Sequence, residues 1–498
     1  MNAAKAGALV VGVIAGCAAA QALAQPLGPA EVNVTNDPRH RYGELQLAVN
    51  PKNPSNIVMA VVELGYNYAC QAAKAPECEM VQSKLVGPGQ PGLTQPQGTY
   101  AGTGFNKVVA FASFDRGRTW KRVELPAHPS AHPRLAGRGD PSVTAGADGA
   151  FYFSWDALDW GTPEAALPSA GVAVTKSTDG GLTWRDPVLT GVPADGPKVT
   201  ADPNTGTIYA AASSALGPLS TGDPNAPFNP HRDRWLVSST DGVKWTKPEG
   251  MGGQASMSAA RGVLAAVFKT EARDNMFTAA NNQLCGSAPA PCILFETTKN
   301  AGASWSRSVL KVESSSTGRP GVAADPAKAG HFAVFVPVNG DKEFWIYETR
   351  DSGTTWSGPG KVAEDTTKQH FHPWMEYAPN GVLGLLWRTR QPAPGQAAAP
   401  AAPPSGGPPT FGAGPAPAPY NIWASISRDG GATFSEPLKV SRADSPAPQG
   451  GMFGNSGDDY SALALDREYL YAGWPDWRPG DRQNLFRAIK FDEFKDRR

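Results

Sequence analysis

The chain has 498 residues and no net charge at pH 7, because 45 lysine and arginine residues balance 45 aspartate and glutamate residues. This balance gives no reason to expect nucleic acid or an anionic membrane as a partner, because such partners favour a strongly basic protein. Glycine and proline contribute 55 and 47 residues, a composition that is typical of short strands joined by many tight turns.

The N-terminus has the pattern of an export signal. Lys5 is the only charge before an apolar run over residues 6–20, and an Ala-Leu-Ala sequence that ends at Ala24 supplies small residues for a signal peptidase. We expect residues 1–24 to be removed and residues 25–498 to act in the periplasm or outside the cell. The apolar run is too short for a membrane span.

The five cysteines agree with export. Cys17 ends a lipobox-like sequence, so a lipid anchor is the alternative to a free exported protein. The other four form two local pairs, Cys70 with Cys78 and Cys285 with Cys292, and each pair would close a short loop as a disulfide in an oxidising compartment. Zinc is the alternative, but these spacings do not match a paired CxxC site. We expect no cofactor.

Seven apolar hairpins recur along the chain, and each would supply the two inner strands of a four-stranded unit. From the N-terminus their strands span 44–50 and 57–62, 141–145 and 151–155, 198–202 and 208–211, 255–259 and 263–268, 321–325 and 332–336, 373–377 and 382–387, and 460–465 and 470–474.

An eight-residue pattern, Ser/Thr-x-Asp-x-Gly-x-Thr-Trp/Phe, recurs six times between these hairpins. Clean copies begin at Ser113, Ser177, Thr349 and Ser427, and degenerate copies begin at Ser239 and Thr298. The aspartate can accept backbone N–H bonds within a turn, the glycine permits a positive φ, and the aromatic residue packs between sheets. We therefore expect each copy to join a third strand to an outer fourth strand, as a structural rather than a catalytic device.

The last unit has three strands, because residues 483–491 follow its hairpin and no further box is present. Residues 31–35 form a spare strand just after the signal, and pairing the two segments would remove two exposed edges. The sequence therefore predicts an all-β fold, a propeller with seven four-stranded blades closed by the N-terminal strand, with six blades as the alternative. Residues 391–419 are almost all proline, alanine and glycine, which predicts a disordered loop inside blade six.

The boxes and the hairpin spacing resemble the sialidase superfamily of bacterial Asp-box (BNR-repeat) propellers, over nearly the whole mature chain. The resemblance implies an exported glycoside hydrolase of the exo-α-sialidase type. Such enzymes hold a substrate carboxylate with three arginines, and they use a tyrosine paired with a glutamate as nucleophile and an aspartate as acid/base. Their first arginine stands in an Arg-Ile-Pro motif that this sequence lacks, the nearest segment being residues 39–44. A binding propeller without chemistry is the alternative.

In a propeller, the start of each innermost strand and the end of each second strand face one mouth of the central channel. Here these positions are polar, which is typical of a binding site. The strand starts carry Arg41, Glu44, Asp140, Lys198, Arg319, His372, Asp459 and Tyr460, and the strand ends carry Glu63, Asp156, Lys269, Arg388, Arg390, Asp476 and Arg478.

The family's roles can be assigned to these positions as hypotheses. Asp140 is the predicted acid/base and Tyr460 the predicted nucleophile, while Arg319, Arg388 and Arg478 would hold an anionic sugar. The alternative for the Gly-Asp-Pro and Gly-Arg-Pro segments is ordinary turn chemistry before a strand.

Three further residues complete the predicted substrate site, namely Arg41, Asp476 and His372. An ion pair between Asp476 and Arg478 that fixes the last blade is the alternative for those two residues. His370 and His372 alternate on one strand and could hold a metal, but they lack a clear third ligand, and we expect no metal. We expect a monomer that binds a glycan or another small polar ligand.

Overall fold

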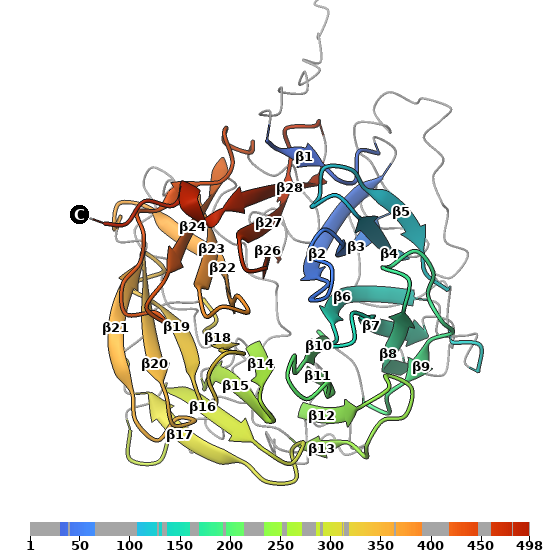
Figure 1. Ribbon diagram of the computed structural model, residues 1–498, viewed down its shortest axis with the longest axis horizontal. Coiled ribbons are helices and arrows are strands. Elements are labelled where there is room, and N and C mark those ends of the chain that lie inside the picture. The colour runs from blue at the N-terminus through green and yellow to red at the C-terminus, as the bar shows by residue number, and fades with distance from the viewer. Residues whose placement is uncertain are drawn as a thin grey trace, which may run out of the picture.

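The computed structural model describes residues 30–37, 40–64, 107–126, 129–131, 137–159, 169–192, 196–213, 234–250, 256–270, 285–288, 292–310, 312, 318–362, 365–390, 418–446, 460–480 and 482–497. Within these residues, seven four-stranded antiparallel sheets surround a central axis as the blades of a propeller (Figure 1). The first strand of each blade contacts the first strands of both neighbouring blades, so these strands surround the channel. The seven-bladed prediction is confirmed, and the six-bladed alternative is wrong.

Each blade takes its strands in chain order from the channel outward, except that the N-terminus supplies the outermost strand of blade 7. Blade 1 contains β2 (Arg41–Val49), β3 (Ile57–Leu64), β4 (Lys107–Ser113) and β5 (Lys121–Glu124); blade 2 contains β6 (Gly137–Ala145), β7 (Phe151–Asp159), β8 (Ser169–Ser177) and β9 (Val188–Leu189). Blade 3 contains β10 (Lys198–Ala201), β11 (Ile208–Ser213), β12 (Arg234–Ser239) and β13 (Glu249–Gly250); blade 4 contains β14 (Ser256–Ala260), β15 (Val263–Lys269), β16 (Ile293–Thr298) and β17 (Ser306–Leu310). Blade 5 contains β18 (Gly321–Ala324), β19 (Phe332–Val338), β20 (Glu343–Thr349) and β21 (Ser357–Val362); blade 6 contains β22 (Gln369–Tyr377), β23 (Leu383–Arg390), β24 (Tyr420–Ser427) and β25 (Leu438–Lys439). Blade 7 contains β26 (Ala462–Leu465), β27 (Tyr469–Asp476), β28 (Gln483–Lys490) and β1 (Val32–Asn33), and a short 3₁₀-helix, η3 (Phe491–Glu493), follows β28.

The ring closes where the two ends of the chain meet. Strand β1, drawn in blue, pairs antiparallel with the red strand β28 in Figure 1, with Val32 opposite Phe486 and Asn33 opposite Leu485. This is the predicted closure, in which the N-terminal segment covers the open edge of the last blade. Because β1 has only two residues, side-chain contacts must hold the closure as well.

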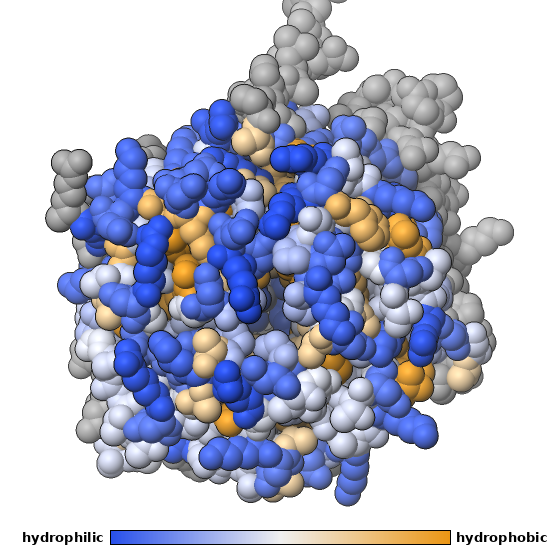
Figure 2. Space-filling model, in the orientation of Figure 1, coloured by the Kyte–Doolittle hydropathy of each residue, from blue (hydrophilic) through white to orange (hydrophobic). Residues whose placement is uncertain are grey.

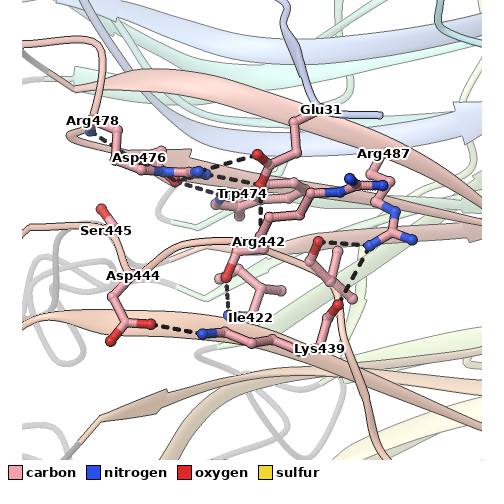
Figure 3. Close-up of polar contacts among 12 residues, drawn as sticks. Glu31, Ile422, Lys439, Arg442, Asp444, Ser445, Trp474, Asp476, Arg478 and Arg487 are labelled. Atoms are coloured by element: carbon pink, nitrogen blue, oxygen red, sulfur yellow. Dashed lines mark hydrogen bonds and ion pairs between the residues drawn. The ribbon is translucent and has the colours of Figure 1, made fainter. Parts of the chain in front are cut away.

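A buried ion cluster supplies such contacts (Figure 3). The guanidinium of Arg478 donates to both carboxylate oxygens of Glu31, at 3.1 Å from Nη1 and 3.0 Å from Nη2, and also to Asp476 at 2.7 Å. The same Glu31 carboxylate accepts the backbone N–H of Arg442 at 3.1 Å. The N-terminal segment is thereby bound to blade 7 and to the chain that follows blade 6.

The predicted boxes form the turns between third and fourth strands. In the first box, Asp115 Oδ1 accepts the backbone N–H of Thr119 at 2.9 Å and Oδ2 accepts its hydroxyl at 2.6 Å. The hydroxyl of Ser113 accepts the N–H of Gly117 at 2.8 Å, and the indole of Trp120 donates to the Gly117 carbonyl at 2.9 Å. The aspartate thus serves the turn, as its place in the repeat predicted.

Each glycine that ends a box turn lies against the preceding blade. A Cβ atom added to Gly181 of blade 2 would lie 2.7 Å from the side chain of Val58 in blade 1, and one added to Gly353 of blade 5 would lie 2.7 Å from Phe295 in blade 4. Both glycines have φ above 90°, a conformation that other residues rarely adopt. The boxes therefore stabilise contacts between blades as well as their own hairpins.

The predicted disulfide between Cys285 and Cys292 is present. The pair Cys70 and Cys78, the signal segment 1–24 and residues 391–417 of the predicted loop 391–419 lie outside the described residues. Among the described residues, no helix is long and apolar enough to cross a membrane, and no group of three or more metal-ligating side chains is arranged to hold a metal ion. The face of the molecule shown in Figure 2 is largely hydrophilic and is hollowed near its centre.

Candidate functional site

Three innermost strands carry the same irregularity near their starts. Strands β2, β6 and β22 each contain a β-bulge, and Glu44, Asp140 and His372 lie there with φ angles of 52°, 47° and 47°. A left-handed backbone at a residue other than glycine costs on the order of 1–2 kcal/mol, and such strain is concentrated at functional sites. A bulge also re-aims the side chain that it carries, so these three positions mark one end of the channel as the candidate site.

The two predicted catalytic residues meet at this end. The hydroxyl of Tyr460, just before β26, donates to Asp140 Oδ1 at 2.7 Å, although 320 residues separate the two in the sequence. The backbone N–H of Asp140 donates to Glu44 Oε2 at 2.8 Å. Blades 1, 2 and 7 therefore bring together a phenol and two carboxylates, of which Glu44 is buried and Asp140 is partly exposed.

Lys198, at the start of β10, adds a cation beside this pair. Its Nζ atom lies 4.1 Å from the centroid of the Tyr460 ring and 5.8 Å from that of Trp374. Burial lowers the pKa of Lys198 to about 8, although the carboxylate of Asp140 favours the charged form. The side chain therefore remains mostly protonated at neutral pH.

Two more charged residues act on the ammonium group of Lys198. Arg319, just before β18, is exposed, and its positive charge also lowers the pKa of Lys198. Asp156, in the second half of β7, is buried and favours the protonated form of Lys198. The predicted mouth is thus a mixed-charge site to which blades 1, 2, 3, 5 and 7 contribute.

Sequence reasoning missed Glu376, which lies on β22 two residues beyond Trp374 and on the same side of that strand. Burial alone raises the pKa of Glu376 to about 8, so its carboxyl group holds a proton at neutral pH and can donate a hydrogen bond. The signal in the sequence was its position on an innermost strand, where alternate residues such as Trp374 and Glu376 face the same side. Lys198 and Glu44 were named as mouth positions but were given no role.

Arg388 lies beside the site but not at its surface. The residue is 0% exposed, its Nε donates to the hydroxyl of Ser461 at 2.8 Å, and its Nη2 donates to the backbone carbonyl of Tyr460. In this position Arg388 holds the main chain of Tyr460 rather than a ligand.

The remaining predicted residues are also engaged within the protein. Arg478 and Asp476 form the buried ion pair that was the alternative to a ligand role. Arg41 is buried with its guanidinium 5.0 Å from the centroid of the Trp477 ring. His372 lies on its bulge with its ring 5.2 Å from that of Phe371. Of the three predicted arginines, Arg319 is the one exposed at the mouth.

The sequence matches no protein-family model and no curated protein at a significant level. Solved structures with a similar fold include a Dyadobacter fermentans protein of unknown function, at 14% identity and a TM-score of 0.45 over 93% of this chain and 98% of that one. A Hadza microbial sialidase matches at 16% identity and a TM-score of 0.41 over 78% and 74% of the two chains. The endosialidase of phage phi92 matches at 9% identity and a TM-score of 0.45 over 92% and 68%.

At these identities and TM-scores, the activities of those proteins do not transfer to this chain. The seven four-stranded sheets and the box turns make the chain a seven-bladed β-propeller in fold. Its chemistry has to be inferred from the residues at the mouth.

Proposed function

We propose that this protein is an exported glycoside hydrolase of the exo-α-sialidase type, with Asp140 and Tyr460 as its catalytic pair. The hydrogen bond of 2.7 Å between the Tyr460 hydroxyl and Asp140 Oδ1 is the observation that carries the proposal. A carboxylate within hydrogen-bond reach of a hydroxyl is the arrangement that activates a nucleophile. The signal-like residues 1–24 and the disulfide support export.

The proposed reaction begins when Asp140 takes the phenol proton as the Tyr460 oxygen forms a bond to the anomeric carbon. The glycosidic C–O bond breaks, and the leaving oxygen takes the proton that Asp140 received. Water then attacks the anomeric carbon and the bond to the Tyr460 oxygen breaks, while Asp140 takes a proton from the water and passes it to that phenol oxygen. A tyrosine suits an anomeric carbon that bears a carboxylate, because its phenol is neutral while the substrate binds and therefore does not repel that carboxylate.

Glu44 and Arg388 support this pair in the proposal. Glu44 accepts the N–H of Asp140 and so fixes the strained backbone of the acid/base residue, while Arg388 fixes the backbone carbonyl of Tyr460. Arg319 is the exposed cation that would meet an anionic sugar. Such fixed geometry is what a catalytic pair requires.

A non-catalytic carbohydrate-binding propeller is the second candidate. The observation that favours it is the burial of Arg388 and Arg478, which leaves Arg319 alone of the three predicted arginines at the surface of the mouth. In that case the mouth would bind a glycan without cleaving it.

Hydrolysis of a fluorogenic α-sialoside separates the two candidates. The wild-type protein should release the fluorophore, Tyr460→Phe should lower kcat by about 100-fold or more, and Arg319→Ala should mainly raise KM. Melting temperatures serve as the control for folding. Binding of sialosides without hydrolysis would support the binding propeller. If the wild-type protein neither binds nor hydrolyses sialosides, both functions are rejected.

A further inference from the structure

The ammonium group of Lys198 takes no part in the hydrogen bonds described at the mouth. Its Nζ is shielded from solvent, and no described residue accepts a hydrogen bond from it. A buried polar group without such a partner is costly and calls for an explanation. The face of the Tyr460 ring, 4.1 Å away at its centroid, lies within the range of a cation–π interaction. The ammonium is therefore held against the residue proposed as nucleophile.

We propose that Lys198 is a positioning residue for this nucleophile, whose ammonium stabilises the phenolate of Tyr460 that forms as Asp140 takes the phenol proton. The inference rests on the proposed function, because it assigns Lys198 a part in the activation of Tyr460.

The geometry shows how the charge can move at low cost. Before the transfer the negative charge lies on Asp140, which accepts the Tyr460 hydroxyl at 2.7 Å. Afterwards it lies on the phenolate oxygen and, by resonance, on the ring that Lys198 contacts. The ammonium attracts Asp140 and touches the ring, so the charge stays near the same cation throughout. Removal from water strengthens such an attraction.

The protonation of Lys198 then gives the site a pH dependence. The groups that face it are Glu44 on β2, Asp140 on β6 and Asp156 on β7, which favour the charged form, and Arg319 before β18, which disfavours it. With a pKa of about 8, Lys198 is charged below that pH and becomes neutral above it. The support for the phenolate is therefore present at pH 7 and is lost as the pH rises past about 8.

Two substitutions separate charge from shape at this position. Lys198→Arg keeps a permanent charge that can stack on an aromatic ring, and Lys198→Met keeps the length of the side chain without its charge. The phenol of Tyr460 can be titrated by NMR of ¹³Cζ-labelled tyrosine, with Tyr460→Phe identifying its signal among the 12 tyrosines.

The phenol pKa should be about 1–3 units lower in Lys198→Arg than in Lys198→Met, the range for an opposite charge at this distance. Equal phenol pKa values in the two variants would overturn the inference, whatever the catalytic activity. This measurement needs no turnover, so it does not depend on the substrate.

Sialoside hydrolysis gives the catalytic test. Lys198→Met should lower kcat on the order of 100-fold with little change in KM, and Lys198→Arg should restore most of the rate and extend it above pH 8. Unchanged kcat in Lys198→Met would overturn the inference while the hydrolase proposal stands. The expected phenol shift without any hydrolysis would instead overturn the hydrolase proposal and support the contact between Lys198 and Tyr460. If Lys198→Met does not fold, the wild type and Lys198→Arg provide the test, and an identical decline of kcat above pH 8 in both overturns the inference.

Discussion

Replacing Arg478 by methionine should remove the cation that joins two buried carboxylates at the closure of the ring. The side chains of Arg478, Asp476 and Glu31 are all 0% exposed, and the guanidinium donates to the two carboxylates at distances from 2.7 to 3.1 Å. Methionine keeps most of the length of the side chain but offers no donor. The two carboxylates would then face each other without their shared partner (Figure 3).

The free energy of unfolding should fall by about 3–5 kcal/mol, the usual cost of removing one partner from a buried ion pair. This is a large part of the roughly 5–15 kcal/mol that stabilises a folded domain. In the variant, a carboxylate without its cation should have a raised pKa in the folded state, and each unit of that shift corresponds to about 1.4 kcal/mol. A raised carboxylate pKa destabilises the fold increasingly as the pH rises above about 4, so the loss should be smaller at pH 5 than at pH 8.

Urea unfolding followed by the fluorescence of the 14 tryptophans would measure this loss. Arg428→Met is the matched control, because Arg428 is 41% exposed and its partner Asp496 is 81% exposed, and such surface pairs contribute about 0.2–1 kcal/mol. Sialoside binding by the folded fraction of Arg478→Met should be unchanged, since Arg478 lies in the closure. Equal destabilisation by the two substitutions, or a loss of unfolding free energy that does not depend on pH, would refute the claim that the buried cluster stabilises the closure of the ring.

Two further predictions concern blade 5. Gly353→Ala should destabilise the protein by about 1–3 kcal/mol more than Gly206→Ala, which is the range for overpacking. Both glycines have a positive φ, but a Cβ atom added to Gly206 would meet nothing within 4 Å. The urea midpoints of the two variants would show whether their stabilities differ. Buried His331 contacts Asp325 at 2.8 Å and Glu348 at 3.4 Å; burial lowers the pKa of His331, but these carboxylates raise it by more, so the net shift is upward. The contribution of His331 to stability should be complete below about pH 6.5 and lost as the pH rises through the raised pKa. In a His331→Asn variant, stability should therefore fall less between about pH 6 and pH 9 than in the wild type, and an equal fall in both proteins would contradict this.

The blade count, the boxes and the closure could be predicted from the sequence because each has a local pattern. A strand alternates with a period of two residues, a box carries its own acceptor and glycine within eight residues, and the recurrence of these units gives the number of blades. The closure followed from a simple count, since residues 483–491 were a third strand without a fourth and residues 31–35 were a strand without a blade. Pairing of these two edges then favoured seven blades over six.

The roles of the arginines could not be predicted in the same way. Arg319, Arg388 and Arg478 occupy comparable places in the repeat, and the repeat assigns each to the mouth end of its blade. What separates them is the partner that each finds, and Arg478 binds Glu31 across 447 residues of sequence. Periodicity gives the end of a blade on which a charge lies, but burial and pairing depend on neighbours that the fold brings together.

The β-bulges at the mouth are a second feature that the sequence pattern did not predict. Turn chemistry was the alternative that the sequence offered for Asp140 and its following proline, and the structure instead has a bulge inside strand β6. Proline is tolerated at a bulge because the ladder does not require its missing N–H there, and the segment at His372 repeats the arrangement in β22. Since Asp140 reaches Tyr460 from this strained backbone, the local departure from a regular strand is what brings two residues from distant blades within hydrogen-bond distance. The fold alone would place both residues at the mouth, whereas the bulge brings the carboxylate of Asp140 to the hydroxyl of Tyr460.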